Sequence, residues 1–388
     1  MIDYSQKYFS YLEKMEGTAR KAMVSLDLEG EKVVVEDSKK HVNFSSNDYL
    51  GLRTNLYLKK RAIQLIEKYG VGLGGSRLIA GNLHVIESLE KKIADWKKTE
   101  AALIMNSGYQ LNSSVLPALF NRDVFDHKPT VLIDKNVHAS IYDGCNKSEI
   151  NLLRYRHNDL NHLRKIFSSR KIKGAKFVIT ESLFSMNGTM PDIREINQIC
   201  SDNDSFLIVD EAHALGVYGE QGRGLAPHAN MTIGTFGKAF GCQGAFLTCS
   251  QKLKQYLVAT CRGLIYTTAP SPAILGSILA ALDLITTMEE PRKKIHSLAK
   301  YFKKNLIRLN LKILSMDSHI ISISMEDVTT AYRFQRQLRD AGVWVKAMFP
   351  PTVAKKNICI RFSICAFHEL EDIDKVISCL TSALNQDA

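Results

Sequence analysis

The sequence has no paired cysteines and no long apolar run. Its eight cysteines are scattered through 388 residues, and none forms the Cys-x-x-Cys pair that many zinc sites use. No uninterrupted apolar segment reaches the roughly 18 residues needed to span a membrane. The N-terminus lacks the basic and then apolar order of a secretory signal. We therefore expect a cytoplasmic protein with reduced thiols, without a metal site and without a membrane partner.

Acidic residues are fewer than basic ones, with 40 Asp and Glu against 51 Lys and Arg and a formal net charge of +11. A basic surface can attract nucleic acids, but it can also attract phosphorylated small molecules such as coenzyme A thioesters. The lysines are spread along the chain, and no arginine-rich tail or nucleic-acid motif accompanies them. We therefore expect no nucleic-acid partner and a solvated surface role for most of these charges.

The middle of the chain alternates between short apolar runs and segments with helical periodicity. Buried strands are predicted at 101–105, 130–134, 177–181, 206–210 and 245–249. Helices are predicted at 55–69, 84–96, 158–167 and 192–200, and from Ser271-Pro272 onward, while the glycines within 70–81 favour an irregular segment. This alternation predicts an α/β fold with a mostly parallel central sheet flanked by helices.

The two ends of the chain have a different character. The first 40 residues are predicted to hold a helix and then a strand at 31–36. Beyond residue 290, strands are predicted at 311–314, 320–323, 343–346 and 358–364, and helices at 293–308, 330–340 and 369–384. We therefore divide the chain into an N-terminal helix and strand segment (1–44), a large domain (45–288) and a smaller α+β C-terminal domain (289–388).

The stretch 232–241 places Lys238 in a tight segment bounded by glycines. A lysine among apolar neighbours loses its proton more readily, and the neutral amine can form a Schiff base. Upstream, Asp210 ends the apolar run 206–210, where open α/β sheets bind ligands, and a protonated pyridine nitrogen would give this carboxylate a cationic partner. Pyridoxal phosphate requires these two groups. The alternatives are a surface lysine in a loop and a strand-end acid that pairs with a helix N-terminus.

Ten short motifs follow one another in a specific order from about residue 40 onward. They are NFSSNDYLGL (43–52), SGY (107–109), HAS (138–140), HND (157–159), FSM (184–186), DEAH (210–213), GEQGRG (219–224), TFGK (235–238), IYTT (265–268) and PPTV (350–353). With them the chain resembles the α-oxoamine synthases, and among these most of all the 8-amino-7-oxononanoate synthases. The resemblance implies the type I pyridoxal-phosphate transferase fold, with 45–288 as the cofactor-binding domain.

The resemblance also implies a catalytic set around the cofactor ring. Lys238 would join the cofactor aldehyde, and Asp210 would hold the ring nitrogen protonated. His213, together with Ser185, would donate a hydrogen bond to the phenolate oxygen, and His138 would stack on the ring face. An isolated histidine beside a strand end is more often structural, but several separate motifs bring these residues together.

The cofactor phosphate needs hydrogen-bond donors. Ser107-Gly108-Tyr109 follows an apolar strand and precedes a predicted helix, so its backbone N–H groups form an anion site at the helix start. Thr235 adds a hydroxyl group. The resemblance implies that Thr267 and Thr268 reach the phosphate from a second subunit, which predicts a homodimer with shared active sites.

The amino-acid substrate needs a fixed cation for its carboxylate, and the guanidinium of arginine suits that role. The resemblance assigns this role to Arg361, assisted by Asn47. Arg361 lies in an apolar run, where a buried guanidinium needs an anionic partner. Substrate contacts are also predicted for His138 and Thr352, and for Arg20 and Lys21 at the acyl thioester.

The sequence departs from the family pattern at a few positions. The N-terminal arginine cluster of the family is reduced to Arg20-Lys21, and Phe349 stands where the family has an arginine before Pro-Pro-Thr-Val. Ile86 stands where the family has a histidine, with His84 two positions earlier. The first two changes fall where the acyl thioester is recognised, so they concern the acyl substrate and leave the cofactor chemistry intact.

The resemblance implies that the chain condenses L-alanine with pimeloyl-coenzyme A, or with the pimeloyl carrier protein, to 8-amino-7-oxononanoate in biotin biosynthesis. A related synthase could instead use another amino acid or acyl group, as in 2-amino-3-ketobutyrate ligases and autoinducer synthases. An aminotransferase on the same fold is a further alternative, and the release of the amino group rather than the carboxylate would distinguish it. A non-catalytic scaffold is disfavoured because Lys238, Asp210, His138 and His213 are all present.

Overall fold

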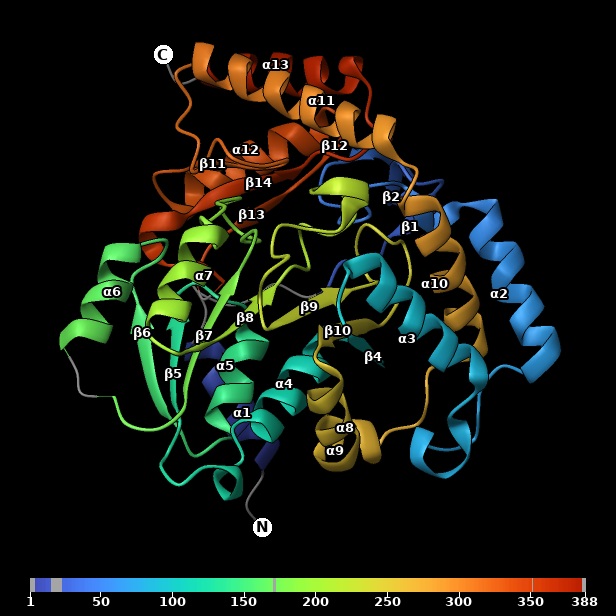
Figure 1. The fold of residues 1–388 in the computed structure, drawn as a ribbon. Helices are drawn as coiled ribbons and strands as arrows, with labels where there is room; N and C mark the ends of the chain where they lie inside the picture. Colours follow the sequence, from blue (N-terminus) through green and yellow to red (C-terminus); the bar gives the residue numbers. More distant parts are fainter. Residues whose placement is uncertain (1–3, 15–22, 170–171, 351, 386–388) are drawn as a thin grey trace.

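The computed structural model describes residues 4–14, 23–169, 172–350 and 352–385. Its centre is a seven-stranded sheet with the strand order β4-β10-β9-β8-β7-β5-β6 (Figure 1). The strands are β4 (Ala101–Met105), β5 (Thr130–Asp134), β6 (Asn151–Tyr155), β7 (Lys176–Glu181), β8 (Phe206–Asp210), β9 (Met231–Thr235) and β10 (Ala245–Cys249). Only β10 runs antiparallel to its neighbours, so the prediction of a mostly parallel sheet is confirmed.

Helices cover both faces of this sheet. One face packs against α4 (Gly108–Leu119), α5 (Ala139–Asn146) and α8 (Gln251–Thr260). The other packs against α2 (Leu56–Tyr69), α3 (His84–Lys97) and α10 (Pro272–Ile285) and, farther along, against α6 (Leu160–Ser169) and α7 (Ile193–Asp202). Leu103 and Ile104 are neighbours in β4 and belong to these two different cores. A strand that is buried on both faces is therefore apolar without alternation.

Polar residues begin these helices as the sequence predicts. The side chains of Asn55, Ser107 and Ser271 each accept a backbone N–H of the first helical turn. Asp192 caps α7 by accepting the N–H of Glu195, but the Glu195 carboxylate pairs with Arg164 on α6. Asp192 is thus an N-cap at the start of the predicted helix 192–200, and Glu195 forms an ion pair to the neighbouring helix rather than a capping box.

The C-terminal part forms a three-stranded sheet, with the order β11-β14-β13, under the helices α11, α12 and α13 (Figure 1). The strands are β11 (Ile320–Ser324), β13 (Lys346–Met348) and β14 (Cys359–Ser363). The helices are α11 (Glu289–Arg308), α12 (Val328–Asp340) and α13 (Leu370–Asn385). In Figure 1 this layer lies at the opposite end of the molecule from α1 (Tyr4–Lys14).

A second small sheet joins the two ends of the chain. Its order is β1 (Asp27–Glu29), β2 (Val33–Glu36), β3 (Lys39–Asn43) and β12 (Val343–Trp344), and β12 pairs with β3 in parallel. The N-terminal helix α1 covers Tyr4–Lys14, and the short helix α9 covers Arg262–Ile265. The N-terminal strands and the C-terminal part therefore share one sheet, while the domain limits at residues 44 and 288 remain a prediction.

Some strand predictions were wrong. The predicted strand 311–314 contributes only an isolated bridge between Ile313 and Ile323, because the N–H of Leu311 still closes the end of α11 on the carbonyl of Leu306. The predicted strand 343–346 divides at Val345, so that β12 pairs with β3 and β13 pairs with β14. The segment 70–81 holds one π-helical turn, Arg77–Gly81. The strands β6 and β9 were not predicted.

Within the described ranges, no single helix has the length and apolar character to cross a membrane, and only the bent pair α10 and α11 passes that test jointly. The eight cysteines are all free thiols, and six of them are buried.

Candidate active site

One cavity of about 180 Å³ lies at the carboxyl ends of β7, β8 and β9. It is lined by Gly108, Tyr109, Asn112, His138, Ser140, Glu181, Asp210, Ala212, His213, Ile233, Gly234, Thr235 and Lys238. The lysine, the aspartate and both histidines that the sequence singled out therefore share one cavity. Asn112, Ser140 and Glu181 were not predicted.

Asp210 ends β8 with only 7% of its surface exposed. Its Oδ1 accepts the N–H of Ala212 at 2.9 Å, and its Oδ2 accepts the side-chain amide of Asn112 at 3.3 Å. No ion pair to this carboxylate is present among the residues that the structure describes. A buried carboxylate with only neutral donors remains available for a cation inside the cavity.

Lys238 lies in the loop that follows β9, half-buried beside Asp210 and Glu181. Burial lowers the pKa of its amine, and the nearby Asp210 and Glu181 carboxyls partly offset this effect. Within the described part of the chain, the amine makes no hydrogen bond. A lysine with a lowered pKa and an unpaired amine is suited to covalent chemistry with an aldehyde.

His138 is the N-cap of α5, and its Nδ1 accepts the backbone N–H of Ser140 at 3.2 Å. Its own backbone N–H donates to Glu181 Oε1 at 2.6 Å. Burial lowers the pKa of His138, which favours the neutral ring, and burial raises the pKa of Glu181 well above its usual range, with further help from Asp210. Glu181 could have been found from the sequence, because it ends the predicted strand 177–181 and open α/β sheets bind ligands at strand ends.

Asn112 holds the two sides of the cavity together. Its side-chain amide donates to Ser140 Oγ at 2.9 Å and to Asp210 Oδ2 at 3.3 Å. Its Oδ1 is buried and has no hydrogen-bond partner. Asn112 lies one turn after Gly108 in α4, so only the helical geometry of that segment could have indicated its position.

His213 is buried and contacts the hydroxyl group of Tyr49 through Nδ1 at 2.6 Å. Burial lowers the pKa of His213 well below its usual range, and the nearby Lys238 and Arg361 cations lower it further. The Tyr49 hydroxyl also donates to Asn47 Oδ1 at 3.2 Å. Tyr49 lies in a motif that the sequence analysis identified, but its place in the site was not predicted.

Arg361 lies on β14 and is 5% exposed. Its Nε donates to the carbonyl oxygen of Ser185 at 2.6 Å, and its Nη2 donates to Asn47 Oδ1 at 3.2 Å. Both acceptors are neutral, and the described residues provide no carboxylate within ion-pair distance. The guanidinium is thus held in place while its charge remains uncompensated, which suits an anionic ligand.

The N-terminus of α4 fits a phosphate group. Ser107 caps the helix by accepting the N–H of Gln110, and the space in front of Gly108 holds no atom within 4 Å of where a Cβ would lie. The hydroxyl group of Thr235 accepts the N–H of Gly237 and donates to the carbonyl oxygen of Gly244, each at 3.1 Å. With the free carboxylate of Asp210 and the amine of Lys238, this donor set fits pyridoxal phosphate.

The remaining predicted residues lie around this centre. Thr267 Oγ1 accepts the Asn106 amide at 3.2 Å, and the carbonyl oxygen of Thr268 accepts it at 2.9 Å, so both threonines lie near the end of β4 in the same chain. Thr352 is exposed, and its N–H donates to the carbonyl oxygen of Phe349 at 3.0 Å. Arg20 and Lys21 lie outside the described residues.

The structure shows the environment of the positions that depart from the family pattern at Ile86 and Phe349. Ile86 is fully buried in the core between α2, α3 and α10, whereas His84 is exposed. Phe349 is half-buried, and its ring centroid lies 5.1 Å from that of Tyr332 on α12.

Comparisons with known proteins agree with this geometry. The sequence model of the aminotransferase class I and II family matches residues 39–380. A putative 8-amino-7-oxononanoate synthase of Paramagnetospirillum magneticum is 40% identical over 346 residues, which cover 88% of both chains. The 8-amino-7-oxononanoate synthase of Gluconacetobacter diazotrophicus is 36% identical over 373 residues, covering 95% of this chain and 94% of that one.

Two solved structures extend the comparison. A serine palmitoyltransferase with pyridoxal phosphate as its internal aldimine matches with a TM-score of 0.91 and 26% identity, covering 99% of each chain. An 8-amino-7-oxononanoate synthase from Francisella tularensis matches with a TM-score of 0.77 and 27% identity, covering 89% of this chain and 98% of that one.

Proposed function

We propose that this chain, which belongs to the aminotransferase class I and II family and within it to the 8-amino-7-oxononanoate synthases, is a pyridoxal-phosphate-dependent acyltransferase. It condenses L-alanine with a pimeloyl thioester and releases CO2, giving 8-amino-7-oxononanoate for biotin biosynthesis. The observation that carries the proposal is the shared cavity of Lys238, Asp210, His138 and His213. The names of the relatives support the choice of substrates.

The residues of the cavity would divide the work between them. When bound, pyridoxal phosphate supplies an electron sink for a carbanion at the amino-acid α-carbon. The Asp210 carboxylate would hold a proton on the ring nitrogen, and the α4 N-terminus would bind the phosphate. The lowered pKa of Lys238 leaves a larger share of its amine neutral, so that Lys238 would hold the cofactor at its aldehyde group and could accept a proton at Nζ. Arg361 would bind the substrate carboxylate.

A second cavity supports an anionic carrier on the acyl substrate. It has a volume of about 810 Å³ and lies between α12 and β13, beside Phe349. Its lining includes the basic residues Arg333, Arg336, Arg339 and Lys346. Phosphate groups, such as those of coenzyme A, suit a cavity with several cations. Because Phe349 brings an aromatic ring instead of a guanidinium, we expect a weaker preference for acyl chains that end in a carboxylate.

A homodimer with shared active sites belongs to the same proposal. Large apolar side chains are exposed around the segment that a bridge joins to Thr268, namely Val71, Leu78, Ile79 and Tyr266. Exposed apolar patches of this kind commonly form interfaces between subunits. We also place the protein in the cytoplasm, and its eight free cysteines support a reducing compartment.

The test is a screen of amino acids against acyl thioesters, followed by thiol release and product mass. We expect thiol release with L-alanine and pimeloyl-coenzyme A, and a product mass that shows loss of CO2. Keto-acid formation from alanine alone would instead indicate an aminotransferase. Borohydride reduction and peptide mapping of the holoenzyme should place the cofactor on Lys238, and an adduct on another lysine would remove that assignment.

A further inference from the structure

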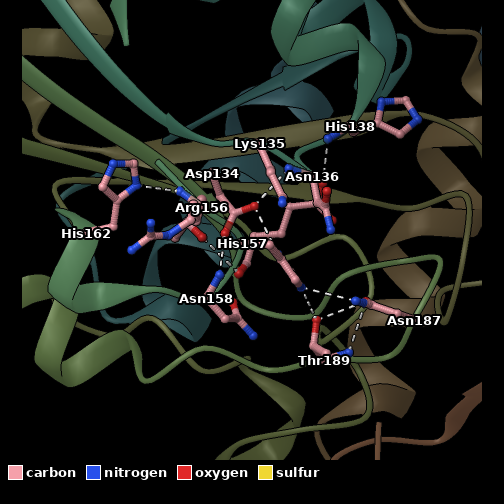
Figure 2. A network of polar contacts seen from close by, with 12 residues as sticks. Asp134, Lys135, Asn136, His138, Arg156, His157, Asn158, His162, Asn187 and Thr189 are labelled. Carbon is pink, nitrogen blue, oxygen red and sulfur yellow. Dashed lines mark hydrogen bonds and ion pairs between the residues drawn. The ribbon is translucent and has the colours of Figure 1, made fainter. Parts of the chain in front are cut away.

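The motif His157-Asn158-Asp159 has no role in the proposed reaction. His157 follows β6, and its side chain is 14% exposed between Asp134 on one side and the segment after β7 on the other (Figure 2). Its Nδ1 lies 3.0 Å from Asp134 Oδ1, and its Nε2 lies 2.8 Å from Thr189 Oγ1 and 3.1 Å from Asn187 Nδ2. The ring therefore joins two segments that are separated in the sequence.

The position of the His157 ring is fixed by its hydrogen bonds. Asp134 is fully buried at the end of β5, and its carboxylate also accepts the N–H groups of Asn136 at 2.8 Å and Asn158 at 2.9 Å. A carboxylate only accepts, so the proton of the neutral ring lies on Nδ1. Nε2 is then an acceptor for the Asn187 amide or the Thr189 hydroxyl group. A ring held from both sides can anchor whatever it contacts.

The contacted segment is the Ser185 loop, which we define as residues 182–190. Its far side is bound to the C-terminal part. The carbonyl oxygen of Gly188 accepts the hydroxyl group of Ser318 at 2.8 Å, and that of Met186 accepts the hydroxyl group of Ser322 at 2.6 Å. Gly188 has a φ of 72°, and a Cβ there would lie 2.2 Å from the carbonyl oxygen of Ile320. The Ser185 loop is thus held between His157 and the sheet that carries Arg361.

The Ser185 loop also holds Arg361 directly. The carbonyl oxygen of Ser185 accepts Arg361 Nε at 2.6 Å, and Asn47 Oδ1 accepts Nη2 of the same guanidinium at 3.2 Å. Hydrogen bonds weaken steeply with distance and angle, so a displaced Ser185 carbonyl would release the guanidinium. We propose that His157 is a positioning residue for Arg361: Asp134 orients His157, His157 holds the Ser185 loop, and the loop directs Arg361 toward the amino-acid carboxylate. This inference rests on the proposed function, which assigns that carboxylate to Arg361.

A purely structural role for His157 is the competing explanation. The ring packs edge-on against Phe184 at 4.5 Å between centroids, so His157 could serve the core alone. His157→Phe separates the two roles, because it keeps an aromatic ring against Phe184 and removes all three polar contacts of the ring. His157→Gln is the conservative variant, since its amide can still reach Thr189. Thr189→Val breaks the same contact from the loop side.

His162→Phe is the matched control. His162 lies on the same connection, and its Nδ1 accepts the backbone N–H of Arg156 at 2.9 Å. No contact between His162 and the Ser185 loop is recorded within the described residues. The two substitutions therefore remove a histidine of similar local setting, but only one of them removes a contact with the Ser185 loop.

The experiment measures the dissociation constant of L-alanine by calorimetry on each holoenzyme, with KM, kcat and the urea midpoint of unfolding. We expect His157→Phe to raise the dissociation constant and KM for alanine about tenfold, the loss typical of a buried hydrogen-bond contact, while kcat changes by less than about threefold. Thr189→Val should also raise the dissociation constant and KM for alanine. His157→Gln should give values between those of the parent and His157→Phe, and His162→Phe should match the parent. The His157→Phe/Thr189→Val double variant should lose less than the sum of the single losses.

The proposal is overturned if His157→Phe and Thr189→Val bind alanine as the parent does, even where their unfolding midpoints fall. If His157→Phe does not fold, Thr189→Val decides the question alone. A parent that binds alanine but releases no thiol from any acyl thioester would remove the proposed function, and this inference would still be judged by the dissociation constants.

Discussion

The two halves of the candidate site are built differently. The cofactor half lies at the ends of β7, β8 and β9, where Asp210 and His213 are each 7% exposed and adjacent strands fix their spacing. The proposed acyl half lies at the margin of the C-terminal part, on α12 and β13, where Phe349 is half-buried and Arg336 is exposed. Buried strand ends can hold reacting groups accurately, whereas exposed side chains can change without disturbing the fold. Residues that differ from the family pattern are therefore tolerated more easily in the acyl half.

The electrostatics of the two halves differ in the same way. In the cofactor half, burial lowers the pKa values of Lys238, His138 and His213, so these bases lose a proton more readily there than in water. In the acyl half, burial and the neighbouring Arg339 cation lower the pKa of Lys346, so cations face one another there. The cofactor half therefore suits proton transfer, and the acyl half suits the binding of an anion.

The largest effect of any single substitution is expected at Asp210, in the cofactor half. Asp210→Asn should reduce kcat by about 10³-fold, because a neutral amide no longer stabilises a protonated ring nitrogen at the point where charge develops. Cofactor content, measured by absorbance, should remain substantial. Asp283→Asn, at a partly exposed aspartate of α10, is the control. Equal turnover of Asp210→Asn and the parent would show that Asp210 is structural.

Arg361→Ala should have the next largest effect. Removing a buried guanidinium that pairs with a substrate carboxylate typically costs a few kcal/mol, so KM for alanine should rise about 100-fold while the cofactor stays bound. Steady-state kinetics with varied alanine give this value. Arg194→Ala, at an exposed position of α7, should match the parent. An unchanged KM in Arg361→Ala would place the carboxylate site elsewhere.

Acid should lower the free energy of unfolding through His368, which lies between β14 and α13. His368 is fully buried, and burial lowers its pKa from 6.5 to about 4. Between pH 6.5 and 4 the unfolded chain therefore binds a proton at His368, whereas the folded chain does not. The free energy of unfolding falls as the pH decreases through this range. Between pH 6.5 and pH 5 the loss from this group is about 2 kcal/mol.

Urea unfolding at both pH values measures this effect. His368→Gln should show a shallower fall in the free energy of unfolding, although it starts less stable because His368 Nδ1 accepts the N–H of Cys365 at 3.0 Å. His84→Gln, at an exposed histidine, should keep the slope of the parent. An identical slope in His368→Gln would show that this ring does not titrate in the window.

The smallest effect is expected in the acyl half. Phe349→Arg should shift the ratio of kcat/KM for pimeloyl-coenzyme A over octanoyl-coenzyme A by about tenfold toward pimeloyl, because a charge partner is restored. Ile307→Arg adds the same charge at an exposed position of α11 and should leave the ratio unchanged. A parent that ignores octanoyl-coenzyme A, with no shift in Phe349→Arg, would remove Phe349 as a specificity determinant.

Two strands of the central sheet, β6 and β9, were not predicted for reasons that lie in their own sequences. β6 was not predicted because Asn151–Tyr155 is an edge strand with only Tyr155 buried. The apolar pattern of its sequence is therefore weak. β9 was not predicted because Met231–Thr235 contains a glycine and two threonines. Residues 231–234 are buried here by pairing with β8 and β10. The buried strands 101–105 and 206–210 were predicted correctly because their sequences are apolar, except for Asp210 at the end of the second.

The sequence by itself determined the α/β alternation and the two groups that pyridoxal phosphate requires, Lys238 and Asp210. These follow from short segments whose periodicity and residue types act locally. Only the tertiary structure decided that Glu181 contacts His138, that Tyr49 contacts His213 and that the Ser185 loop connects His157 with Arg361. Such contacts join residues far apart in the chain, and they depend on which strand ends meet, which no local pattern specifies.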